Sequence, residues 1–518
     1  MKAETLNQIY GKNEIQQAQR YQFLSTKFQS KFNEKPEVYV RSPGRVNLIG
    51  EHIDYSGFPV LPMALDRDVV IALSEIKLSS SKSTFVVVSN LLEKYKDLTF
   101  LHSSVETDSS EAHGWHSYFF CAYKALIRQI KISTPKSFNA MIDGVVPTGA
   151  GVSSSAALCC ASVLAISAIN DISLSQEQLI NISIEAEHMV GVKCGGMDQS
   201  ISVMGQENSA VMIHFYPKLK GLPTPIPSKI VLQQLNNFDS PVFVVANTLK
   251  VSDKHETAAT NYNLRVVETA LAGAILFKKL NLVIEDGLIQ KNNLLTLRQV
   301  MDIVAFGEVK NGNMKSYDFE VDGKECLNLM LSIVEQHLKS QPYTREEVAL
   351  ELGISVRDLV KKFIDDQYLT VKADKFELYK RAKHVYSETL RVLKFDQICT
   401  GKEVLPIPNE ILYALGNLMN ESQSSCRDLF NCSCDELDEL VKLNLSFGAF
   451  GSRLTGAGWG GCTVSLVGES MVDEFVKNLK DSYFTKEKLQ AAGMTLDELN
   501  DVVFYCKPGT GSRIVNYS

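Results

Sequence analysis

Hydrophobic and polar residues alternate in several short stretches of the first half of the chain. In "EVYVRSPG", Val38 and Val40 alternate with polar neighbours, which predicts a strand that runs into a Pro-Gly loop. Further strands are predicted in "RDVVIALSEI" and "STFVVVS", a helix in "SYFFCAYKALIRQI", and extended structure again in "SFNAMIDGVVP". The first half is therefore predicted to be mixed α and β.

A helix with a clear beginning and end is predicted in "SQEQLINISIEAEHMVG". Ser175 and Gln178 have the pattern of a capping box, and Gly191 is the residue type that ends a helix. Glu187 falls in the last turn of this helix. The apolar residues between the two ends recur at the spacing of one helix face: Leu179, Ile182, Ala186 and Met189.

A turn-rich tract with four prolines, residues 216–230, is the predicted domain boundary or edge connection. After it, "PVFVVANT" predicts a strand and "AATNYNLRVVETALAGAILFKKL" a helix. We therefore predict an N-terminal domain over residues 1–235 and a C-terminal domain over residues 236–518. The second domain is expected to carry a mostly helical insert around residues 289–371.

The charge of the chain does not indicate a polyanionic partner. The formal net charge is −7 and no block of lysine and arginine stands out, which argues against a nucleic-acid groove or an anionic membrane surface. A helix-turn-helix-like pattern at residues 344–364 is not notably basic, so a packed pair of helices is favoured over a DNA-reading motif. The longest apolar run, residues 156–169, is shorter than the roughly 20 residues that span a bilayer. We expect small molecules or proteins as partners, with no nucleic acid and no membrane.

The cysteines and the N-terminus indicate a cytoplasmic protein. The N-terminal residues are polar and lack the apolar region of a secretory signal. The chain has 11 scattered cysteines, and the group Cys426, Cys432 and Cys434 lacks the second pair or the histidines of a zinc site. Buried free thiols in a reducing compartment are the favoured interpretation.

The stretch "PTGAGVSSSAA" combines backbone freedom with hydroxyl groups directly before a predicted helix. Gly149 and Gly151 can adopt positive φ, and Ser153, Ser154 and Ser155 can cap the helix, which together would make an anion site at a helix N-terminus. The stretch has no Gly-Lys-Ser/Thr, and Ser stands where a Rossmann loop has its third glycine. It is therefore either the phosphate site of another nucleotide-binding class or an ordinary capped helix after a glycine turn.

The stretch "RSPGRVNLIGEHIDY" crowds charged residues beside two glycines. Glu51, His52 and Asp54 can hydrogen-bond several hydroxyls at once, as a sugar requires, and Arg45 can pair with phosphate oxygens. The alternative is a solvated turn after a strand. It is less favoured because apolar residues can anchor the segment to a core: Val46, Leu48 and Ile49.

Two carboxylates follow in "EAEHMVGVKCGGMDQS". Glu187 would lie at the unfavourable end of the helix dipole, and a cation such as Mg²⁺ would explain it, although an exposed helix carboxylate is the simpler alternative. Asp198 follows Gly195 and Gly196, where backbone can approach a ligand closely. Near the C-terminus, "FGSRLTGAGWGGCTVSL" is another glycine-rich segment that opens into a predicted strand.

Together these four stretches resemble the galactokinase branch of the GHMP small-molecule kinases. "RSPGRVNLIGEHIDY" is similar to the galactokinase signature, "PTGAGVSSSAA" to the phosphate-binding loop of the family, and "TGAGWGGC" to its third motif. "KHETAATNYNLRV" and "LYKRAKHVYSETLRVL" are similar to a eukaryotic subgroup of fungal galactokinases and animal N-acetylgalactosamine kinases. The resemblance implies an α+β fold of two domains, with ATP and sugar in the cleft between the N- and C-terminal domains.

The resemblance also implies a reaction, in which the γ-phosphate of ATP is transferred to the anomeric hydroxyl of galactose to give galactose 1-phosphate and ADP. Asp198 would take the proton from that hydroxyl, and Arg45 would orient it, keep Asp198 ionised and offset charge on the phosphoryl group. The implied contacts to the sugar come from Glu51, His52, Asp54, Gly195 and Tyr262. Those to ATP come from Gly149, Gly151, Ser153, Ser154, Ser155 and Trp115, and those to Mg²⁺ from Ser155 and Glu187.

Other interpretations remain open from the sequence. An N-acetylgalactosamine kinase would use the same motifs. A sugar-sensing and ATP-sensing inducer that binds a transcriptional repressor would resemble fungal relatives, but noncatalytic members lack a Ser-Ala pair in the phosphate loop and "SSSAA" is complete here. A purely structural protein would require four motifs to coincide by accident.

Overall fold

The computed structural model describes residues 3–77, 83–105, 114–191, 194–227, 239–251, 259–283, 294–306, 319–403, 405, 410–495 and 498–517. The chain divides into two compact units, each assembled from segments that are distant in sequence. The first unit comprises Met1–Val46, Pro62–Val211 and Cys506–Ser518, and the second comprises Asn47–Leu61 and Met212–Tyr505. The predicted boundary between residues 235 and 236 lies outside the described residues and stays a prediction.

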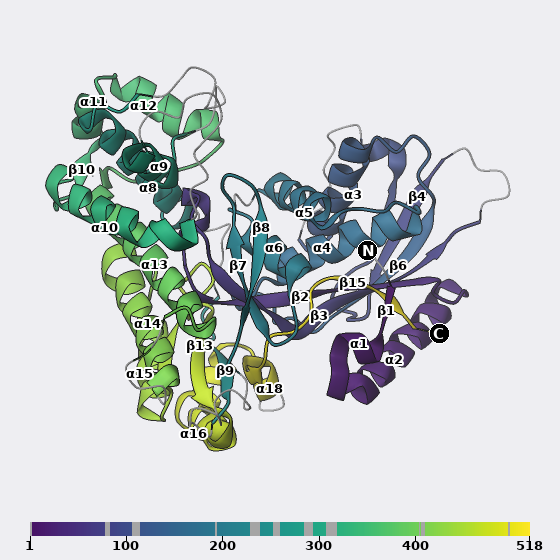
Figure 1. Ribbon diagram of the computed structural model, residues 1–518. Helices are drawn as coiled ribbons and strands as arrows, with labels where there is room; N and C mark the ends of the chain where they lie inside the picture. The colour runs from purple at the N-terminus through teal and green to yellow at the C-terminus, as the bar shows by residue number, and fades with distance from the viewer. Residues whose placement is uncertain are drawn as a thin grey trace. The chain divides into compact units, whose positions relative to one another are not determined.

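The first unit contains a seven-stranded sheet in the order β1-β15-β2-β3-β6-β4-β5 (Figure 1). The C-terminal strand β15 runs parallel to β1 and antiparallel to β2, the strand that carries Arg45, so both β1 and β15 join the same sheet. The four predicted strands of the first half are confirmed as β2 (Val38–Ile49), β3 (Leu61–Glu75), β4 (Phe85–Asn90) and β6 (Phe138–Gly144). The predicted Pro-Gly loop after the first of them is wrong, because β2 continues through Pro43 and Gly44. Three strands of the sheet were not predicted: β1 (Ala3–Thr5), β5 (Leu98–Leu101) and β15 (Arg513–Asn516).

Helices cover both faces of this sheet (Figure 1). On one face, α1 (Leu6–Tyr10) and α2 (Glu14–Phe32) pack through an aromatic and aliphatic core. On the other face, four helices pack against one another: α3 (His116–Ile130), α4 (Ser154–Ile169), α5 (Gln176–Val190) and α6 (Met197–Met204). Because α4 is surrounded by the other three, it is apolar on almost every side.

The predicted limits of α5 are confirmed. Ser175 Oγ accepts the backbone N–H of Gln178, the capping box is complete, and Gly191 ends the helix at φ 106°. Glu187 therefore lies in the last turn, as its position in the sequence indicates.

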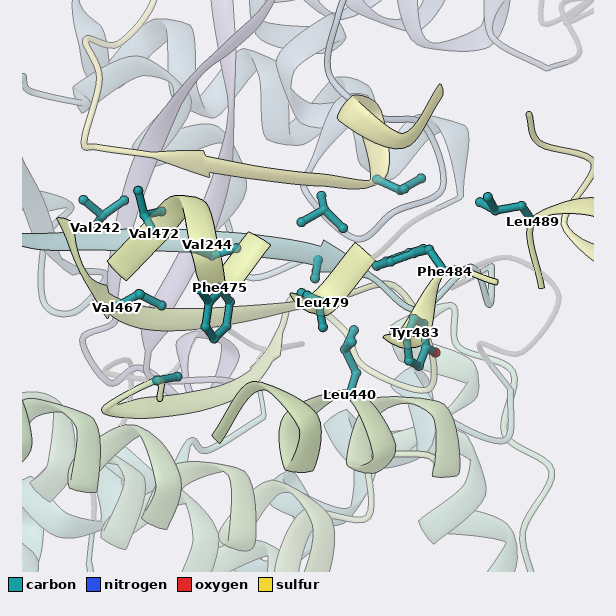
Figure 2. Packing of buried hydrophobic residues seen from close by; sticks show 14 residues of the cluster. Val242, Val244, Leu440, Val467, Val472, Phe475, Leu479, Tyr483, Phe484 and Leu489 are labelled. Carbon is teal, nitrogen blue, oxygen red and sulfur yellow. The ribbon is translucent and has the colours of Figure 1, made fainter. Parts of the chain in front are cut away.

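The second unit contains a four-stranded sheet in the order β12-β13-β9-β14. The middle strand β9 is buried on both faces, so its apolar residues are continuous rather than alternating. One face packs on α16, whose apolar residues recur at helical spacing from Val472 to Tyr483 (Figure 2). The strands span Pro241–Asn247 (β9), Gly451–Thr455 (β12), Cys462–Gly468 (β13) and Val503–Cys506 (β14).

The helices of the second unit include the long helix α13, which packs against α8, α10 and α14. The described part of the predicted insert is mostly helical. Helices α11 and α12 pack on each other and on α8, which confirms the packed pair expected at residues 344–364. Their bounds are Tyr262–Lys279 (α8), Leu297–Phe306 (α9), Phe319–His337 (α10), Arg345–Leu352 (α11), Val356–Phe363 (α12), Leu378–Cys399 (α13), Ile411–Ser425 (α14), Asp435–Ser446 (α15), Val472–Tyr483 (α16), Lys486–Ala491 (α17) and Leu499–Val502 (α18).

The proline-rich tract at residues 216–230 contains a short strand, β8 (Lys220–Pro225), which belongs to a two-stranded sheet with β7 (Ser209–His214). A strand with only one neighbour tolerates proline, because the missing N–H is not needed by a second strand. In the part of the chain that the structure describes, no helix is both long and apolar enough to cross a bilayer.

Candidate active site

The predicted phosphate loop leads into the N-terminus of α4. Gly149, Gly151 and Ser153 have φ values of 70°, 73° and 59°, in the left-handed region. Glycine adopts this backbone without steric cost, which explains why positions 149 and 151 are glycines. The helix begins at Ser154, and the Ser153 side chain makes no capping hydrogen bond. The expectation that Ser153 caps the helix through its hydroxyl is therefore wrong, because its left-handed backbone differs from the extended backbone of a side-chain cap.

The hydroxyl of Ser153 is instead buried without a hydrogen-bond partner among the described residues. A buried polar group without a partner costs free energy. The first backbone N–H groups of a helix also lack acceptors within the helix. Both features fit an anionic ligand such as the phosphates of ATP.

Arg45 joins this loop to Asp198. Its Nη1 donates to the carbonyl oxygen of Gly151 at 2.6 Å, and its Nε donates to Oδ1 of Asp198 at 2.8 Å. Arg45 and Asp198 are 2% and 6% exposed, so the ion pair is shielded from bulk water. Only glycine fits beside Arg45, because a Cβ on Gly44 would lie 2.7 Å from Val146 Cγ1. One guanidinium therefore connects a carboxylate to the phosphate loop.

Asp198 lies in the first turn of α6, directly after a glycine pair. The helix begins after Gly196, whose φ is 99°, and Gly195 precedes it. A carboxylate is stabilised at the N-terminal end of a helix, because the helix dipole is positive there. The left-handed backbone of Gly196 thus sets the turn that precedes Asp198.

Glu187 is buried, not exposed, which excludes the simpler alternative of a solvated helix carboxylate. It is 1% exposed, Ser155 Oγ donates to its Oε1 at 2.6 Å, and Gln199 Nε2 donates to its Oε2. A carboxylate and a hydroxyl oxygen are ligands that Mg²⁺ prefers, and Mg²⁺ commonly completes its shell with water and phosphate oxygens. Ser155 and Glu187 therefore fit a magnesium ion. Gln199 was not predicted, although it follows Asp198 directly.

Trp115 lies immediately before α3. Its ring centroid is 5.9 Å from that of Tyr95, and its Nε1 is buried without a hydrogen-bond partner among the described residues. A buried indole N–H usually has an acceptor. Its place in a nucleotide pocket stays a prediction.

In the second unit, the third motif holds Glu51 of the signature. Oε1 of Glu51 accepts the backbone N–H of Gly456 at 2.8 Å, and Arg453 Nη1 lies 3.5 Å from the same oxygen. Glu51 and Arg453 are 1% and 0% exposed. The glycine-rich segment near the C-terminus thus helps to fix the position of Glu51.

His52 is held at both ring nitrogens. Nε2 lies 2.8 Å from the carbonyl oxygen of Ala457, and Nδ1 lies 3.1 Å from the hydroxyl of Tyr55. Because a carbonyl oxygen can only accept, Nε2 carries the proton and Nδ1 accepts from Tyr55. Burial, followed by the charge of Asp54, raises the pKa of Tyr55 and keeps its hydroxyl protonated. A direct hydrogen bond from His52 to a sugar would have to replace one of these two bonds.

Aromatic rings gather around His52. Its ring centroid is 4.9 Å from that of Phe430 and 5.6 Å from those of Tyr262 and Trp459. Asp54, which is 9% exposed, begins a short 3₁₀ helix at Asp54–Ser56. The structure therefore brings three predicted sugar residues, Glu51, His52 and Tyr262, into one supported cluster.

Two residues of α13 that the sequence did not single out also hold the signature. Nε2 of His384 contacts the carbonyl oxygen of Glu51 at 3.0 Å, and Oε1 of Glu388 accepts the N–H of Gly50 at 2.8 Å. Burial lowers the pKa of His384 to about 4, so it is neutral near pH 7. Burial alone would raise the pKa of Glu388, but nearby cations, first Arg391, lower it to about 2. Polar residues four apart on one helix, in "HVYSE", are the signal that could have identified them.

Comparison with known proteins connects these clusters to one family. The description "Galactokinase galactose-binding signature" matches residues 26–75, "GHMP kinases N terminal domain" matches residues 117–206, and "GHMP kinases C terminal" matches residues 410–485. The first match contains Arg45 and Glu51, and the second contains the phosphate loop and Asp198.

Full-length relatives agree with these matches. The chain is 40% identical to a galactokinase of Dictyostelium discoideum, with 99% of this chain and 97% of the relative covered, and 39% identical to a galactokinase of Saccharomyces cerevisiae, with 96% and 94% covered. The solved structure of Lactococcus lactis galactokinase complexed with galactose has a TM-score of 0.64 at 22% identity, and covers 95% of this chain and 99% of that one. The predicted α+β GHMP kinase fold is confirmed. The chain therefore belongs to the galactokinases of the GHMP kinase family.

Proposed function

We propose that the chain transfers the γ-phosphate of ATP to the anomeric hydroxyl of galactose, producing galactose 1-phosphate and ADP. The observation that carries this proposal is the double contact of Arg45, which donates to Gly151 in the phosphate loop at 2.6 Å and to Asp198 at 2.8 Å. Membership of the galactokinase family supports galactose and ATP as the substrates.

Asp198 is the group that accepts the proton of the anomeric hydroxyl. Phosphoryl transfer depends mainly on positioning and charge stabilisation, and a carboxylate that accepts the substrate proton is the usual base. The helix dipole and Arg45 both favour the ionised form of Asp198, which is the form that can accept a proton. As the proton reaches Asp198, the oxygen of the sugar forms its bond to the γ-phosphorus and the bond to the β-phosphate oxygen breaks.

The phosphate loop holds the triphosphate. The hydroxyl of Ser153 and the first N–H groups of α4 donate to phosphate oxygens, and Arg45 offsets the charge of the phosphoryl group as it moves. Ser155 and Glu187 hold Mg²⁺, which when bound neutralises charge on the phosphates. Gly149 and Gly151 keep the backbone close to the ligand.

The cluster of the second unit recognises the sugar. Glu51, Asp54 and Tyr262 offer oxygen atoms to hydroxyl groups, and the support given to Glu51 by Gly456 fixes the direction of its carboxylate. Because both ring nitrogens of His52 are occupied, we propose that His52 acts mainly by packing beside Tyr262 and by holding Tyr55.

We place this reaction in the cytoplasm. All 11 cysteines of the chain are free, and each is buried or partly buried. Free thiols persist in a reducing compartment.

The test is an ATP-dependent phosphorylation assay with Mg²⁺ that compares galactose with N-acetylgalactosamine. We expect a higher kcat/KM for galactose than for N-acetylgalactosamine. We also expect that turnover stops when Mg²⁺ is removed with a chelator and returns when Mg²⁺ is added back. A higher kcat/KM for N-acetylgalactosamine would assign the chain to the acetamido sugar. Binding of sugar and ATP without turnover of either sugar would indicate a noncatalytic sensor instead.

A further inference from the structure

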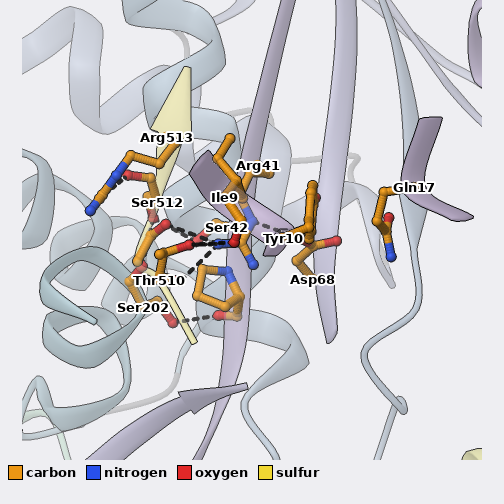
Figure 3. Close-up of polar contacts among 12 residues, drawn as sticks. Ile9, Tyr10, Gln17, Arg41, Ser42, Asp68, Ser202, Thr510, Ser512 and Arg513 are labelled. Atoms are coloured by element: carbon orange, nitrogen blue, oxygen red, sulfur yellow. Dashed lines mark hydrogen bonds and ion pairs between the residues drawn. The ribbon is translucent and has the colours of Figure 1, made fainter. Parts of the chain in front are cut away.

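The C-terminal segment of the first unit contacts both elements that carry the proposed catalytic pair. Arg45 lies on β2, and Asp198 lies in the first turn of α6. Three serines connect these elements: Ser42 on β2, Ser202 on α6 and Ser512 in the C-terminal segment (Figure 3). We call them the serine clamp. Each is 0% exposed, so their hydrogen bonds do not compete with bulk water.

The hydrogen bonds of the serine clamp link each of the three elements to the other two. The N–H and the hydroxyl of Ser512 both donate to the carbonyl oxygen of Ser202, at 2.7 and 2.8 Å. Because the one hydroxyl hydrogen of Ser512 is used there, Ser42 is the donor in its 2.8 Å bond to Ser512 Oγ. Ser202 Oγ in turn donates to the carbonyl oxygen of Pro43 at 2.8 Å. Hydrogen bonds therefore join β2 to the C-terminal segment, the C-terminal segment to α6, and α6 back to β2.

These hydrogen bonds lie close to the proposed catalytic pair in the sequence of both β2 and α6. Ser42 and Pro43 precede Arg45 by three and two residues on β2. Ser202 follows Asp198 by four residues, which is about one turn of the helix. A shift of α6 relative to β2 would therefore change the 2.8 Å distance between Arg45 Nε and Asp198 Oδ1.

Glycine residues allow the C-terminal segment to lie directly against α6. The N–H of Gly511 donates to the carbonyl oxygen of Gly205 at 2.8 Å. A Cβ on Gly511 would lie 2.2 Å from the carbonyl oxygen of Val203, and a Cβ on Gly205 would lie 2.6 Å from Ala64 Cβ. No side chain fits at either position, so the close approach depends on these glycines.

Arg41 fixes the other side of the C-terminal segment. Its Nη1 donates to the carbonyl oxygens of Thr510 and Gly511 at 2.7 and 3.1 Å, and its Nε donates to Asp68 at 2.7 Å (Figure 3). The segment is thus anchored to the sheet independently of the serines. A change in the serine clamp should therefore alter the spacing of β2 and α6 without releasing the segment.

We propose that the serine clamp positions Arg45 against Asp198, so that the C-terminal segment determines the geometry of phosphoryl transfer without touching substrate. This inference rests on the proposed function. The clamp residues are positioning residues: they act through Arg45 and Asp198.

The test uses Ser512→Ala and Ser202→Ala, with Ser167→Ala as the matched control. Ser167 is 1% exposed and its hydroxyl donates to Leu164 within its own helix. We expect kcat per galactose-binding site to fall about tenfold in both clamp variants, because small misplacements of reacting groups are costly. We expect KM for galactose and ATP to change less than twofold. Ser202→Ala removes one side-chain hydrogen bond only and serves if Ser512→Ala fails to fold.

A second arm combines each clamp substitution with Arg45→Lys. If the clamp acts through Arg45, its substitution should cost less than twofold in the Arg45→Lys background, so the two effects are not additive. Wild-type kcat in both clamp variants, or the full tenfold loss in the Arg45→Lys background, would overturn the inference. An inactive wild-type protein would overturn the proposed function as well, whereas an active wild type with unaffected clamp variants overturns only the clamp.

Discussion

Two buried arginine–carboxylate pairs have their arginines on the same strand, β2, and we propose a catalytic role for only one of them. Arg41 pairs with Asp68 at 2.7 Å, and Arg45, four residues later on β2, pairs with Asp198 at 2.8 Å. Both arginines are almost fully buried, at 1% and 2% exposure. Burial and ion pairing alone therefore do not distinguish them.

The surroundings of the two pairs differ. Asp68 accepts hydrogen bonds from Arg41 and Tyr10 (Figure 3). It also accepts one from Arg20, which pairs in addition with Asp143 at 2.6 Å. Burial acts to raise the pKa of Asp68, but the two guanidinium groups lower it below its usual value. These elements are strands and helices with regular backbone.

The Arg45 pair, in contrast, lies between two glycine turns. Gly151 and Gly196 have φ values of 73° and 99°, and Arg45 contacts the backbone of the first while Asp198 follows the second. The pair that we propose to be catalytic therefore lies beside irregular backbone that can approach a ligand. The Arg41–Asp68 pair is surrounded by regular elements and by further protein partners.

The largest expected effect is on catalysis at Asp198. Asp198→Asn keeps the size of the side chain but removes the base, so kcat should fall on the order of 10³-fold. Galactose binding should remain measurable. The free energy of unfolding should fall less than in Asp68→Asn, because Arg45 keeps its hydrogen bond to Gly151, whereas Asp68 is shared by two arginines. Steady-state kinetics together with calorimetric binding of galactose check this, and wild-type turnover in the variant would remove Asp198 from the mechanism.

The matching substitution at the other pair should act on stability. Asp68→Asn leaves Arg41 and Arg20 without their shared carboxylate, so the free energy of unfolding of the first unit should fall by about 3–5 kcal/mol. The kcat of the protein that remains folded should stay within a few-fold of wild type. Urea unfolding and kinetics on the same samples measure both quantities. Unchanged stability would mean that this network does not hold the unit together.

A smaller effect is expected from pH. Because the folded pKa of Asp68 is lowered, its contribution to stability is complete above the unfolded value of about 3.9 and is lost as the pH falls below it. The difference in unfolding free energy between wild type and Asp68→Asn should therefore shrink on acidification, by at most about 1.4 kcal/mol per pH unit. Protonation of His384 at low pH affects wild type and Asp68→Asn equally, so it does not change the difference between their free energies of unfolding. A difference that stays constant down to pH 2 would contradict the lowered pKa.

Local patterns in the sequence predicted much of this molecule. The alternation around Val38 predicted β2, the capping box at Ser175 predicted the start of α5, and the glycine-rich loop predicted the turn before α4. These features depend on residues that are neighbours in the chain.

Features that depend on long-range contacts were not predictable in the same way. Gln199 contacts Glu187 from another helix, and His384 reaches Glu51 across more than 300 residues. The placement of β15 between β1 and β2 likewise joins the two ends of the chain. A strand of four residues is too short for its hydrophobic pattern to indicate which strands it pairs with. The position of β15 in the sheet is therefore known only from the structure.

Two matched substitutions, Arg45→Lys and Arg41→Lys, distinguish the proposed catalytic pair from the structural pair when kcat and the unfolding midpoint are measured side by side. Lysine keeps the charge but loses the planar fork that makes two directed hydrogen bonds. We predict that Arg45→Lys lowers kcat on the order of 100-fold with an almost unchanged midpoint, and that Arg41→Lys lowers the midpoint and leaves kcat within a few-fold of wild type. Equal losses of kcat in the two variants, or a loss confined to Arg41→Lys, would contradict the division between a catalytic and a structural pair.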